Sequence, residues 1–437
     1  MKLPSAFFRG KDLISSNIGK RLFAGSFWLV LGAVGGRGLV LISFIFVAHI
    51  IGKNEYGELS IIRSTINMFI AIASMGFGFT ASKYIAQYRH TNREKATEIY
   101  VMYRTISYIM AFFLALILIL FAPVVASKSL NNLSLTLSVR IGALVLLFST
   151  INSVQSGVLS GLEEFKELSK NTFFSGIVQA VFIVICSIYW KVNGAIIGLG
   201  VGCFVLLVFN AFSIKKKFSG NFCKFRNIRK DVYKILWTFS LPSFFSSFLV
   251  IPVLWWAKTF LIAKSGYSEM ANFDVADQWS MIALYLPSTL SQVLLPLLSN
   301  VKEEGTTGQF KKIIKVNLSF NVTITFIISL VLIILSKYIL KLYGSDFNDF
   351  SSLIYMLFAS VIISACGVVG QVIASLDKMW IGFIFNLIWG VWMILFAYLF
   401  VAKGRASGLA LAILLAYSLH FISQMVYLYI KVKKIDS

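Results

Sequence analysis

Residues 215–234, KKKFSGNFCKFRNIRKDVYK, carry eight lysines and arginines and lie at the middle of a chain of 437 residues. Long apolar runs precede and follow this segment, and only short polar breaks separate one run from the next. We interpret the segment as a basic linker between two similar halves. The boundary between the halves is placed inside it, which gives an N-terminal lobe of residues 1–219 and a C-terminal lobe of residues 220–437.

The composition of the two halves indicates a membrane protein. Apolar residues make up 58% of the chain and charged residues 13%, against roughly 25% charged residues in ordinary soluble domains. A water-soluble fold could not bury so much apolar surface. The net charge of +22 would also suit a nucleic-acid-binding protein, but there the basic residues should cluster on a soluble face with interleaved aromatic residues. Here they lie mostly between apolar runs, so nucleic acid is not expected as a partner.

The apolar runs have the length of membrane-spanning helices. One crossing needs about 20 mostly apolar residues, whereas the strands of an outer-membrane barrel are shorter and alternate in polarity. The sequence therefore predicts an all-α membrane protein with twelve transmembrane helices in two six-helix lobes. The predicted helices lie at residues 22–50, 59–82, 101–126, 137–162, 171–190, 194–214, 233–263, 273–298, 313–335, 351–376, 379–402 and 406–430.

Basic residues are unevenly distributed between alternate loops of this scheme. The set of loops that includes both tails and the central linker holds 26 lysines and arginines, and the opposite set holds eight. Because lysine and arginine are concentrated in cytoplasmic loops, both termini are predicted to be cytoplasmic. The linker then faces anionic membrane lipids and is expected to bind their headgroups, with a specific partner site as the alternative. The first helix is too long for a signal peptide and is expected to be retained.

An internal repeat relates the two halves. When the chain is shifted by 214 residues against itself, all six predicted helices of the first half align with those of the second without a gap. Two such units insert in the same orientation and are related by an axis along the membrane normal. A central cavity between the lobes is then the expected transport path. Matching positions include Gly52 with Gly266, Glu55 with Glu269, Lys191 with Arg405, and Gly194 with Gly408.

Helix-breaking residues differ between the halves. The seventh and eighth predicted helices contain four of the six prolines, at Pro242, Pro252, Pro287 and Pro296, and proline kinks a helix. The first two helices instead contain glycines, in LGAVGGRG (residues 31–38) and MGFGF (residues 75–79). Close helix packing and bending during alternating access are both consistent with these glycines.

The segment IIGKNEYGELSIIRSTINMFIAIASMGFGFTASKYIAQYR, residues 50–89, resembles the first-to-second helix signature of bacterial polysaccharide flippases of the multidrug/oligosaccharidyl-lipid/polysaccharide exporter superfamily. The resemblance implies a V-shaped bundle of two lobes in the bacterial inner membrane. It also implies an undecaprenyl-diphosphate-linked oligosaccharide as substrate, flipped to the periplasmic leaflet for O-antigen, lipopolysaccharide or capsule assembly. A polysaccharide polymerase or a chain-length regulator of the same pathway would be the protein partner.

Three basic residues inside the predicted helices are candidates for substrate binding. A charged side chain at the centre of the bilayer costs at least about 2.5–3.5 kcal/mol, so it normally faces a cavity or a partner. Arg37, Arg63 and Lys258 would suit a diphosphate, because guanidinium binds phosphate oxygens in a fork and lysine acts as a point charge. Internal salt bridges are the alternative. Arg104 and Arg140 lie nearer helix ends, from which such side chains reach the interface.

Asp274 and Asp277 form the main acidic candidate. They lie three residues apart at the predicted start of the eighth helix, so both carboxylates face the same side. Carboxylates at a helix start are stabilised by capping and by the helix dipole, which favours a structural role. Proton or sodium coupling, or pairing with Lys258, is the alternative.

Other functions fit the sequence less well. No GxxxxGK[ST] run is present for an ATPase, and a polysaccharide polymerase would need a larger exterior loop than the longest here, of about 15 residues. A cation-coupled multidrug exporter of the same superfamily would be expected to place carboxylates, rather than Arg37, in the cavity of the first lobe. No cofactor is expected, and no metal site, since the three histidines lack metal-ligand spacing.

Overall fold

The computed structural model describes residues 17–218, 230–303, 307–376 and 378–436, and the regular structure in these ranges is helical throughout. The middle of the basic linker, residues 219–229, and most of the basic N-terminal tail lie outside the described residues. The first half contains α2 (Asn17–Ile51), α3 (Lys53–Ser74), α4 (Phe77–Tyr88), α5 (Arg93–Val124), η1 (Val125–Ser129), η2 (Leu133–Leu135), α6 (Thr136–Gly161) and α7 (Phe165–Lys217). The second half contains α8 (Lys230–Ile235), η4 (Leu236–Ser240), α9 (Leu241–Phe248), α10 (Val250–Ser265), α11 (Tyr267–Glu303), α12 (Thr307–Ile334), α13 (Ser336–Tyr343), α14 (Phe350–Ser375) and α15 (Met379–Asp436).

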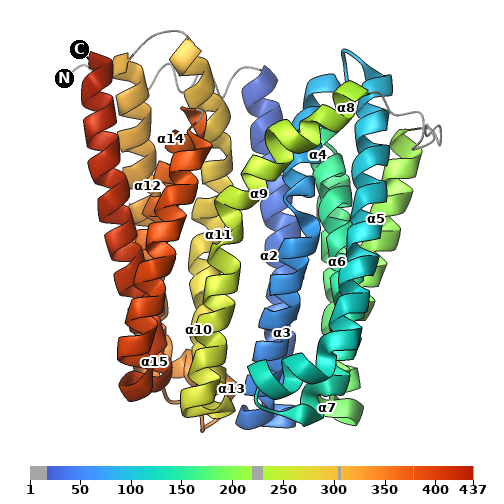
Figure 1. Ribbon diagram of the computed structural model, residues 1–437, viewed down its shortest axis with the longest axis vertical. Coiled ribbons are helices and arrows are strands. Elements are labelled where there is room, and N and C mark those ends of the chain that lie inside the picture. The colour runs from blue at the N-terminus through green and yellow to red at the C-terminus, as the bar shows by residue number, and fades with distance from the viewer. Residues whose placement is uncertain (1–16, 219–229, 304–306, 377, 437) are drawn as a thin grey trace.

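Two of these helices are long enough to cross a bilayer twice. α7 has 53 residues and α15 has 58, against about 20 for one crossing. Non-helical backbone angles divide α7 at Lys191 and α15 at Arg405. With α3 and α4 taken as one bent rod and α8 to α10 as another, the described residues form twelve rods in two lobes (Figure 1). The predicted fold class is confirmed.

If helices are judged by length and apolarity alone, fewer than twelve qualify as membrane spans. Six helices in the described ranges satisfy this criterion, or seven if α3 and α4, which are bent by 42°, are one span. That criterion takes α7 and α15 once each, and the seventh rod is divided into helices too short to satisfy it.

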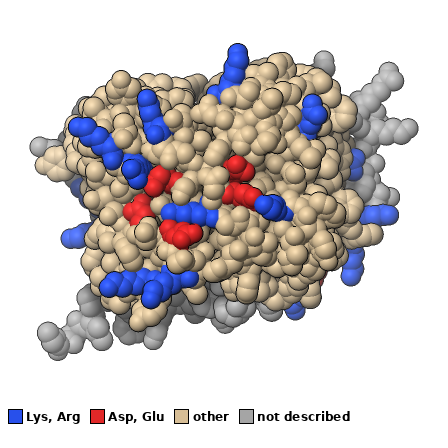
Figure 2. Space-filling model, turned by 90° about the horizontal axis from the view of Figure 1, so that it is seen from below, with Lys and Arg blue, Asp and Glu red and all other residues tan. Residues whose placement is uncertain are grey.

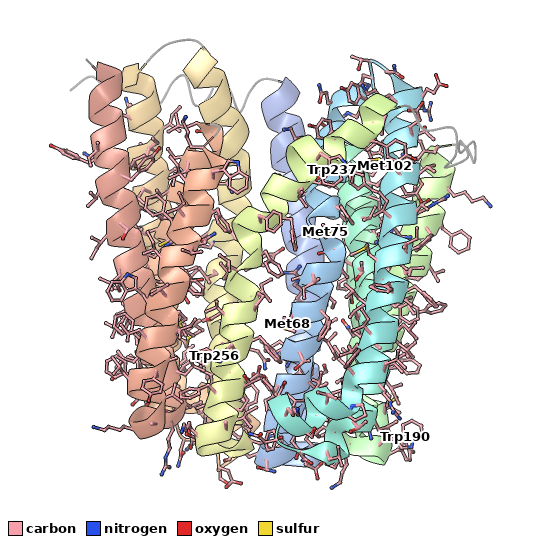
Figure 3. The ribbon with its side chains drawn as sticks, in the orientation of Figure 1. Met68, Met75, Met102, Trp190, Trp237 and Trp256 are labelled. Atoms are coloured by element: carbon pink, nitrogen blue, oxygen red, sulfur yellow. The ribbon has the colours of Figure 1, made fainter. Side chains whose placement is uncertain are left out.

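The outer surface agrees with the membrane assignment: large apolar side chains such as Phe112 and Leu120 on α5 are more than 60% exposed. Tryptophan lies toward both ends, at Trp190 and Trp237 (Figure 3), as is usual at membrane interfaces.

The predicted register of 214 residues is confirmed in the backbone of two corners. Gly52 has φ 79° and ψ 167°, and Gly266 has φ 81° and ψ 178°. Lys191 has φ 49° and ψ −126°, and Arg405 has φ 52° and ψ −129°. All four lie at the end of the molecule opposite to the one where the described chain begins and finishes. We call these two ends the far end and the termini end (Figure 1).

The contacts at these corners repeat as well. Glu55 forms an ion pair with Lys191 at 2.6 Å in the first lobe. Its equivalent, Glu269, accepts a hydrogen bond from the backbone N–H of Ala406 at 3.3 Å in the second. Each half therefore uses a glutamate in the first turn of one helix to hold the corner between two others.

Glycines serve packing in the first helix and bending in the second. A Cβ atom on Gly36 would lie 2.7 Å from the carbonyl oxygen of Thr172, so α2 and α7 can touch only because that atom is absent. Met75 and Gly76 both have positive φ, 41° and 68°, where α3 ends and α4 begins. The packing interpretation therefore holds for Gly36, whereas bending during alternating access stays a prediction for the glycines at the static bend between α3 and α4.

The seventh rod is broken, as its prolines predicted. Pro242 lies in the first turn of α9, after the π-helical turn η4, and Pro252 lies in the first turn of α10. The break carries α8 and η4 across to the first lobe, near Met102 (Figure 3). There Val232 and Ile235 are buried in an apolar cluster with residues of α4, α5 and α6. The beginning of the second half therefore packs on the first.

Candidate substrate site between the lobes

The five predicted site residues lie on four neighbouring helices, α2, α3, α10 and α11, where the lobes meet. We call this region the seam. Arg37 is on α2, Arg63 on α3, Lys258 on α10, and Asp274 and Asp277 on α11. α11 contacts α2, α3 and α10, so the second lobe supplies both carboxylates and the first lobe both arginines.

Arg37 projects from α2 toward the second lobe. Its guanidinium carbon lies 5.7 Å from the centre of the Tyr285 ring on α11. The side chain is exposed, and the described residues contain no carboxylate within ion-pair distance of it. An aromatic face stabilises a cation without neutralising it, so Arg37 keeps a positive charge that an anion can meet.

Arg63 is held between the lobes. It stacks on Phe44 of its own lobe, with 4.0 Å from guanidinium carbon to ring centre, and its Nη1 lies 3.4 Å from Asp274 Oδ2 of the other lobe. Asp274 also accepts a hydrogen bond from Gln278 at 2.5 Å, and Gln278 donates to the hydroxyl of Tyr56 at 2.8 Å. The carboxylate of Asp274 is thus the centre of a polar network that joins the lobes.

Lys258 and Asp277 form a second pair inside the C-terminal lobe. Lys258 Nζ lies 2.8 Å from Asp277 Oδ2, and the two side chains are only 14% and 16% exposed. The ammonium group also lies 5.5 Å from the centre of the Phe273 ring. Of the three basic candidates, Lys258 and Arg63 therefore have carboxylate partners.

The predicted helix start at Asp274 and Asp277 is wrong. α11 begins at Tyr267, so both aspartates lie about two turns or more inside the helix, beyond the reach of capping and of most of the dipole. The turn is made by Gly266, whose φ is 81°. Ion pairing takes the place of the expected helix-start role, including the pairing with Lys258 that the sequence left open.

The internal repeat shows how the two pairs are related. Under the shift of 214 residues Phe44 corresponds to Lys258 and Arg63 to Asp277. The first lobe therefore has a cation on an aromatic ring where the second has a complete ion pair. Within the described part of its own lobe Arg63 contacts the Phe44 ring, and its counter-charge comes from the other lobe.

Sequence reasoning missed the neutral members of the seam. Trp255 on α10 donates to the hydroxyl of Thr65 on α3 at 2.9 Å, and the Tyr56–Gln278 and Arg37–Tyr285 contacts also cross between lobes. None of these residues has an unusual charge or spacing in the sequence. Only the approach of α3 to α10 and α11 makes them neighbours.

Further contacts close the far end. Lys53 Nζ donates to the carbonyl oxygen of Asp346 at 2.7 Å. The ring Nε2 of His49 lies 2.8 Å from the carbonyl oxygen of Leu342. Tyr343 packs edge-on against Tyr56, and burial raises the pKa of Tyr343, so its phenol is neutral there. Seen from this end, acidic side chains gather near the centre of the face, with most basic ones around them (Figure 2).

This architecture, two lobes of membrane-spanning helices joined by the Arg63–Asp274 ion pair across the seam, is that of a multi-pass membrane protein. The chain belongs to the polysaccharide biosynthesis protein family, whose model matches residues 22–302.

Individual relatives agree with this assignment. The chain is 22% identical over 403 residues, 88% of each protein, to the EPS I polysaccharide export inner membrane protein EpsE of Ralstonia solanacearum. It is also 22% identical over 303 residues to the stage V sporulation protein B of Bacillus subtilis, of which the match spans 58%. That match covers 64% of this chain.

Solved structures show the same fold at low sequence identity. An inward-facing multidrug resistance MATE family transporter of the MOP superfamily has a TM-score of 0.75 and 13% identity over 93% of this chain and 99% of that one. A MOP superfamily transporter from Pyrococcus furiosus has a TM-score of 0.74 and 15% identity over 96% of both chains.

Proposed function

We propose that the protein is a flippase that moves undecaprenyl-diphosphate-linked oligosaccharide units from the cytoplasmic to the periplasmic leaflet of the bacterial inner membrane. The family and its polysaccharide-exporting relative support a saccharide cargo, and the fold supports transport between two lobes. The product would be the substrate of O-antigen or capsular polysaccharide assembly. A polymerase or a chain-length regulator of that assembly is the expected partner.

Arg37 is the observation that carries this proposal. It is an exposed arginine in a membrane-spanning helix, turned toward the other lobe, with an aromatic ring rather than a carboxylate beside it. The cost of keeping a charge at that depth has to be offset by a partner. A diphosphate supplies such a partner, because guanidinium binds phosphate oxygens with two parallel hydrogen bonds.

The seam gives less support to a multidrug exporter for organic cations. Such a cargo requires a carboxylate that is available for binding, but Asp274 is paired with Arg63 and Asp277 with Lys258. A cation would have to displace a basic side chain from either of them. Arg37 would in addition repel it.

Binding by the purified full-length protein in lipid nanodiscs tests the proposal. Undecaprenyl diphosphate should bind saturably. Its affinity should fall as the salt concentration is raised, because the contact is between charges. The organic cation tetraphenylphosphonium should bind weakly and without competition from the lipid. Tight binding of the cation, with none of the diphosphate lipid, would favour the exporter instead.

The orientation is a second testable part of the proposal. If the termini end is cytoplasmic, a reporter fused after Lys217 should be active in the cytoplasm and one fused after Gly344 in the periplasm. The reason is the excess of 26 over eight basic residues in the loops of the termini end. Alkaline phosphatase and a cytoplasmic fluorescent protein report the two compartments, and equal signals from both fusions would contradict the scheme.

A further inference from the structure

We infer that Arg63 is a second phosphate-binding group, which Asp274 occupies while the far end is closed and which the substrate must take over before the lobes separate there. This inference rests on the proposed function, because it uses the same anionic cargo. It adds a reason why an empty transporter should stay closed at the far end.

Among the described residues of the seam, the ion pair that joins side chains of the two lobes is Arg63–Asp274, so it has to break when the lobes separate. Arg63 belongs to the first lobe and Asp274 to the second, whereas Lys258 and Asp277 both belong to the second. Rigid movement of the lobes would therefore leave the Lys258–Asp277 pair intact. Removing one partner from a buried ion pair is strongly unfavourable, because the remaining charge is left without compensation.

The geometry of the pair suits exchange rather than permanent closure. The Nη1–Oδ2 distance is 3.4 Å, longer than the 2.8 Å between Lys258 and Asp277, and Arg63 is the more exposed partner, at 23% against 8% for Asp274. A guanidinium group has five N–H donors. A phosphate can therefore approach the exposed side of Arg63 before the contact with Asp274 is lost.

The two partners would be left in different situations after separation. Gln278 lies one turn after Asp274 on α11, so its hydrogen bond to the carboxylate moves with the second lobe. Arg63 would retain the Phe44 ring, which stacks on it but does not neutralise it. The missing interaction is therefore that of an anion with Arg63, which a phosphate group fits.

Arg63 also lies on the route from Arg37 to the far end. Phe44, on which Arg63 stacks, follows Arg37 by seven residues on α2, which is about two turns or about 10 Å along the same face. On α11 the partners Asp274 and Tyr285 are about three turns apart, again on one face. A diphosphate first held at Arg37 would thus meet Arg63 next as it moves toward the far end.

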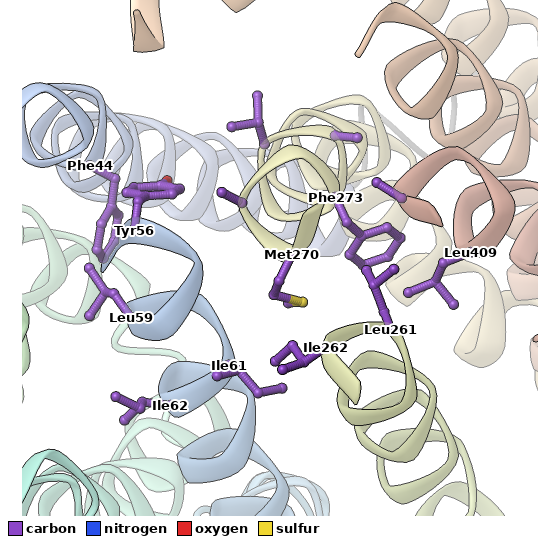
Figure 4. Close-up of a cluster of buried hydrophobic side chains, with 14 of the residues drawn as sticks. Phe44, Tyr56, Leu59, Ile61, Ile62, Leu261, Ile262, Met270, Phe273 and Leu409 are labelled. Carbon is purple, nitrogen blue, oxygen red and sulfur yellow. The ribbon is translucent and has the colours of Figure 1, made fainter. Parts of the chain in front are cut away.

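An apolar contact surrounds the pair and makes its opening cooperative. Side chains of both lobes form one buried cluster there, including Phe44, Tyr56 and Leu59 from the first lobe and Leu261, Met270 and Phe273 from the second (Figure 4). Gly57 lies so near Tyr267 that a Cβ atom would be 1.9 Å from its carbonyl oxygen. The ion pair and this cluster have to separate together.

Chemical labelling of a buried position measures this opening directly. In a variant without the four native cysteines, Ala271→Cys places a thiol at a fully buried site of the same apolar cluster, near the start of α11 at the far end. A membrane-impermeant maleimide is added outside spheroplasts that contain or lack the lipid-linked oligosaccharide. Labelling should be slow without the lipid and faster with it.

The decisive variant is Asp274→Asn in this background. It should raise labelling without substrate by about tenfold, because the closed state loses its cross-lobe ion pair, and addition of substrate should no longer matter. Exchange of the charges in Arg63→Asp/Asp274→Arg should restore slow labelling but not the response to substrate. Glu55→Gln is the matched control, because it removes a carboxylate at the same end from a pair within one lobe, and its labelling should equal that of the parent.

Two outcomes would overturn the inference. Slow labelling of Asp274→Asn, in protein that melts like the parent, would show that the pair does not hold the far end closed. A charge-exchanged protein that still responds to substrate would show that Arg63 is not the group the phosphate takes over. Binding of the diphosphate lipid to the parent protein is measured in parallel. If the parent binds the lipid normally, either outcome contradicts this inference alone. If the parent does not bind the lipid, the proposed function is contradicted as well.

Discussion

Arg37→Ala should lose nearly all surface polysaccharide in cells that depend on this protein, at normal abundance in the membrane. Hydrogen bonds to charged groups contribute about 1.5–3 kcal/mol each, so the loss of even one of the two should weaken diphosphate binding by about ten- to a hundredfold. Arg37→Lys should retain part of the activity, because it keeps the charge but loses the two-pronged geometry. Polysaccharide is measured by immunoblot and the protein by an epitope tag.

Arg140→Ala is the matched control for this experiment. Arg140 is likewise an exposed arginine of a membrane-spanning helix, but it lies near the start of α6 and shares a face with Leu137 and Leu144, which are 55% and 53% exposed. That face suits contact with lipid, so its loss should leave surface polysaccharide unchanged. Full activity of Arg37→Ala, or an equal loss in both variants, would contradict the assignment of Arg37 to the substrate.

Lys258→Met should destabilise the folded protein. It leaves the carboxylate of Asp277 in place at 16% exposure without its partner, and breaking a buried pair from one side costs about 3–5 kcal/mol. Thermal unfolding in nanodiscs, followed by tryptophan fluorescence, should show a clear fall in the midpoint.

The double variant Lys258→Met/Asp277→Leu separates lost pairing from lost packing. Replacing both members of a buried pair by apolar residues of similar volume is often neutral or stabilising, so the double variant should recover most of the midpoint. If it is as unstable as the single variant, the lysine stabilises the helix through its shape. The charge-based explanation would then fail.

The twelve rods and their repetition could be predicted from the sequence, because both depend on the local pattern of apolar and polar residues. The same error in a helix start occurs in both halves. The second and eighth helices were predicted to start at residues 59 and 273, whereas α3 and α11 begin six residues earlier, at Lys53 and Tyr267. Polar residues after each turn glycine resembled a loop. In the structure they are the first turns of helices, where Glu55 and Glu269 are favoured by the dipole.

The pairings within the seam could be predicted only in part. The Lys258–Asp277 pair was open to sequence reasoning, because both residues belong to one lobe and adjacent helices. The partner of Arg63 was not, since Asp274 is 211 positions away and becomes a neighbour only through the packing of α3 on α11. The crossing of α8 onto the first lobe was hidden for the same reason, although the prolines of the seventh helix predicted a break.

That crossing has a consequence for biogenesis. Val232 and Ile235 fill an apolar cluster formed by α4, α5 and α6, and Ser240 hydrogen-bonds the hydroxyl of Tyr103 at 2.8 Å. When the first six spans have been inserted, this cluster still lacks those side chains, so an apolar surface on the nascent first lobe stays open. Translation has to proceed beyond residue 240 before the surface is covered. A ribosome that stalls in the basic linker would therefore leave a half-protein that is fully inserted but has this apolar surface uncovered.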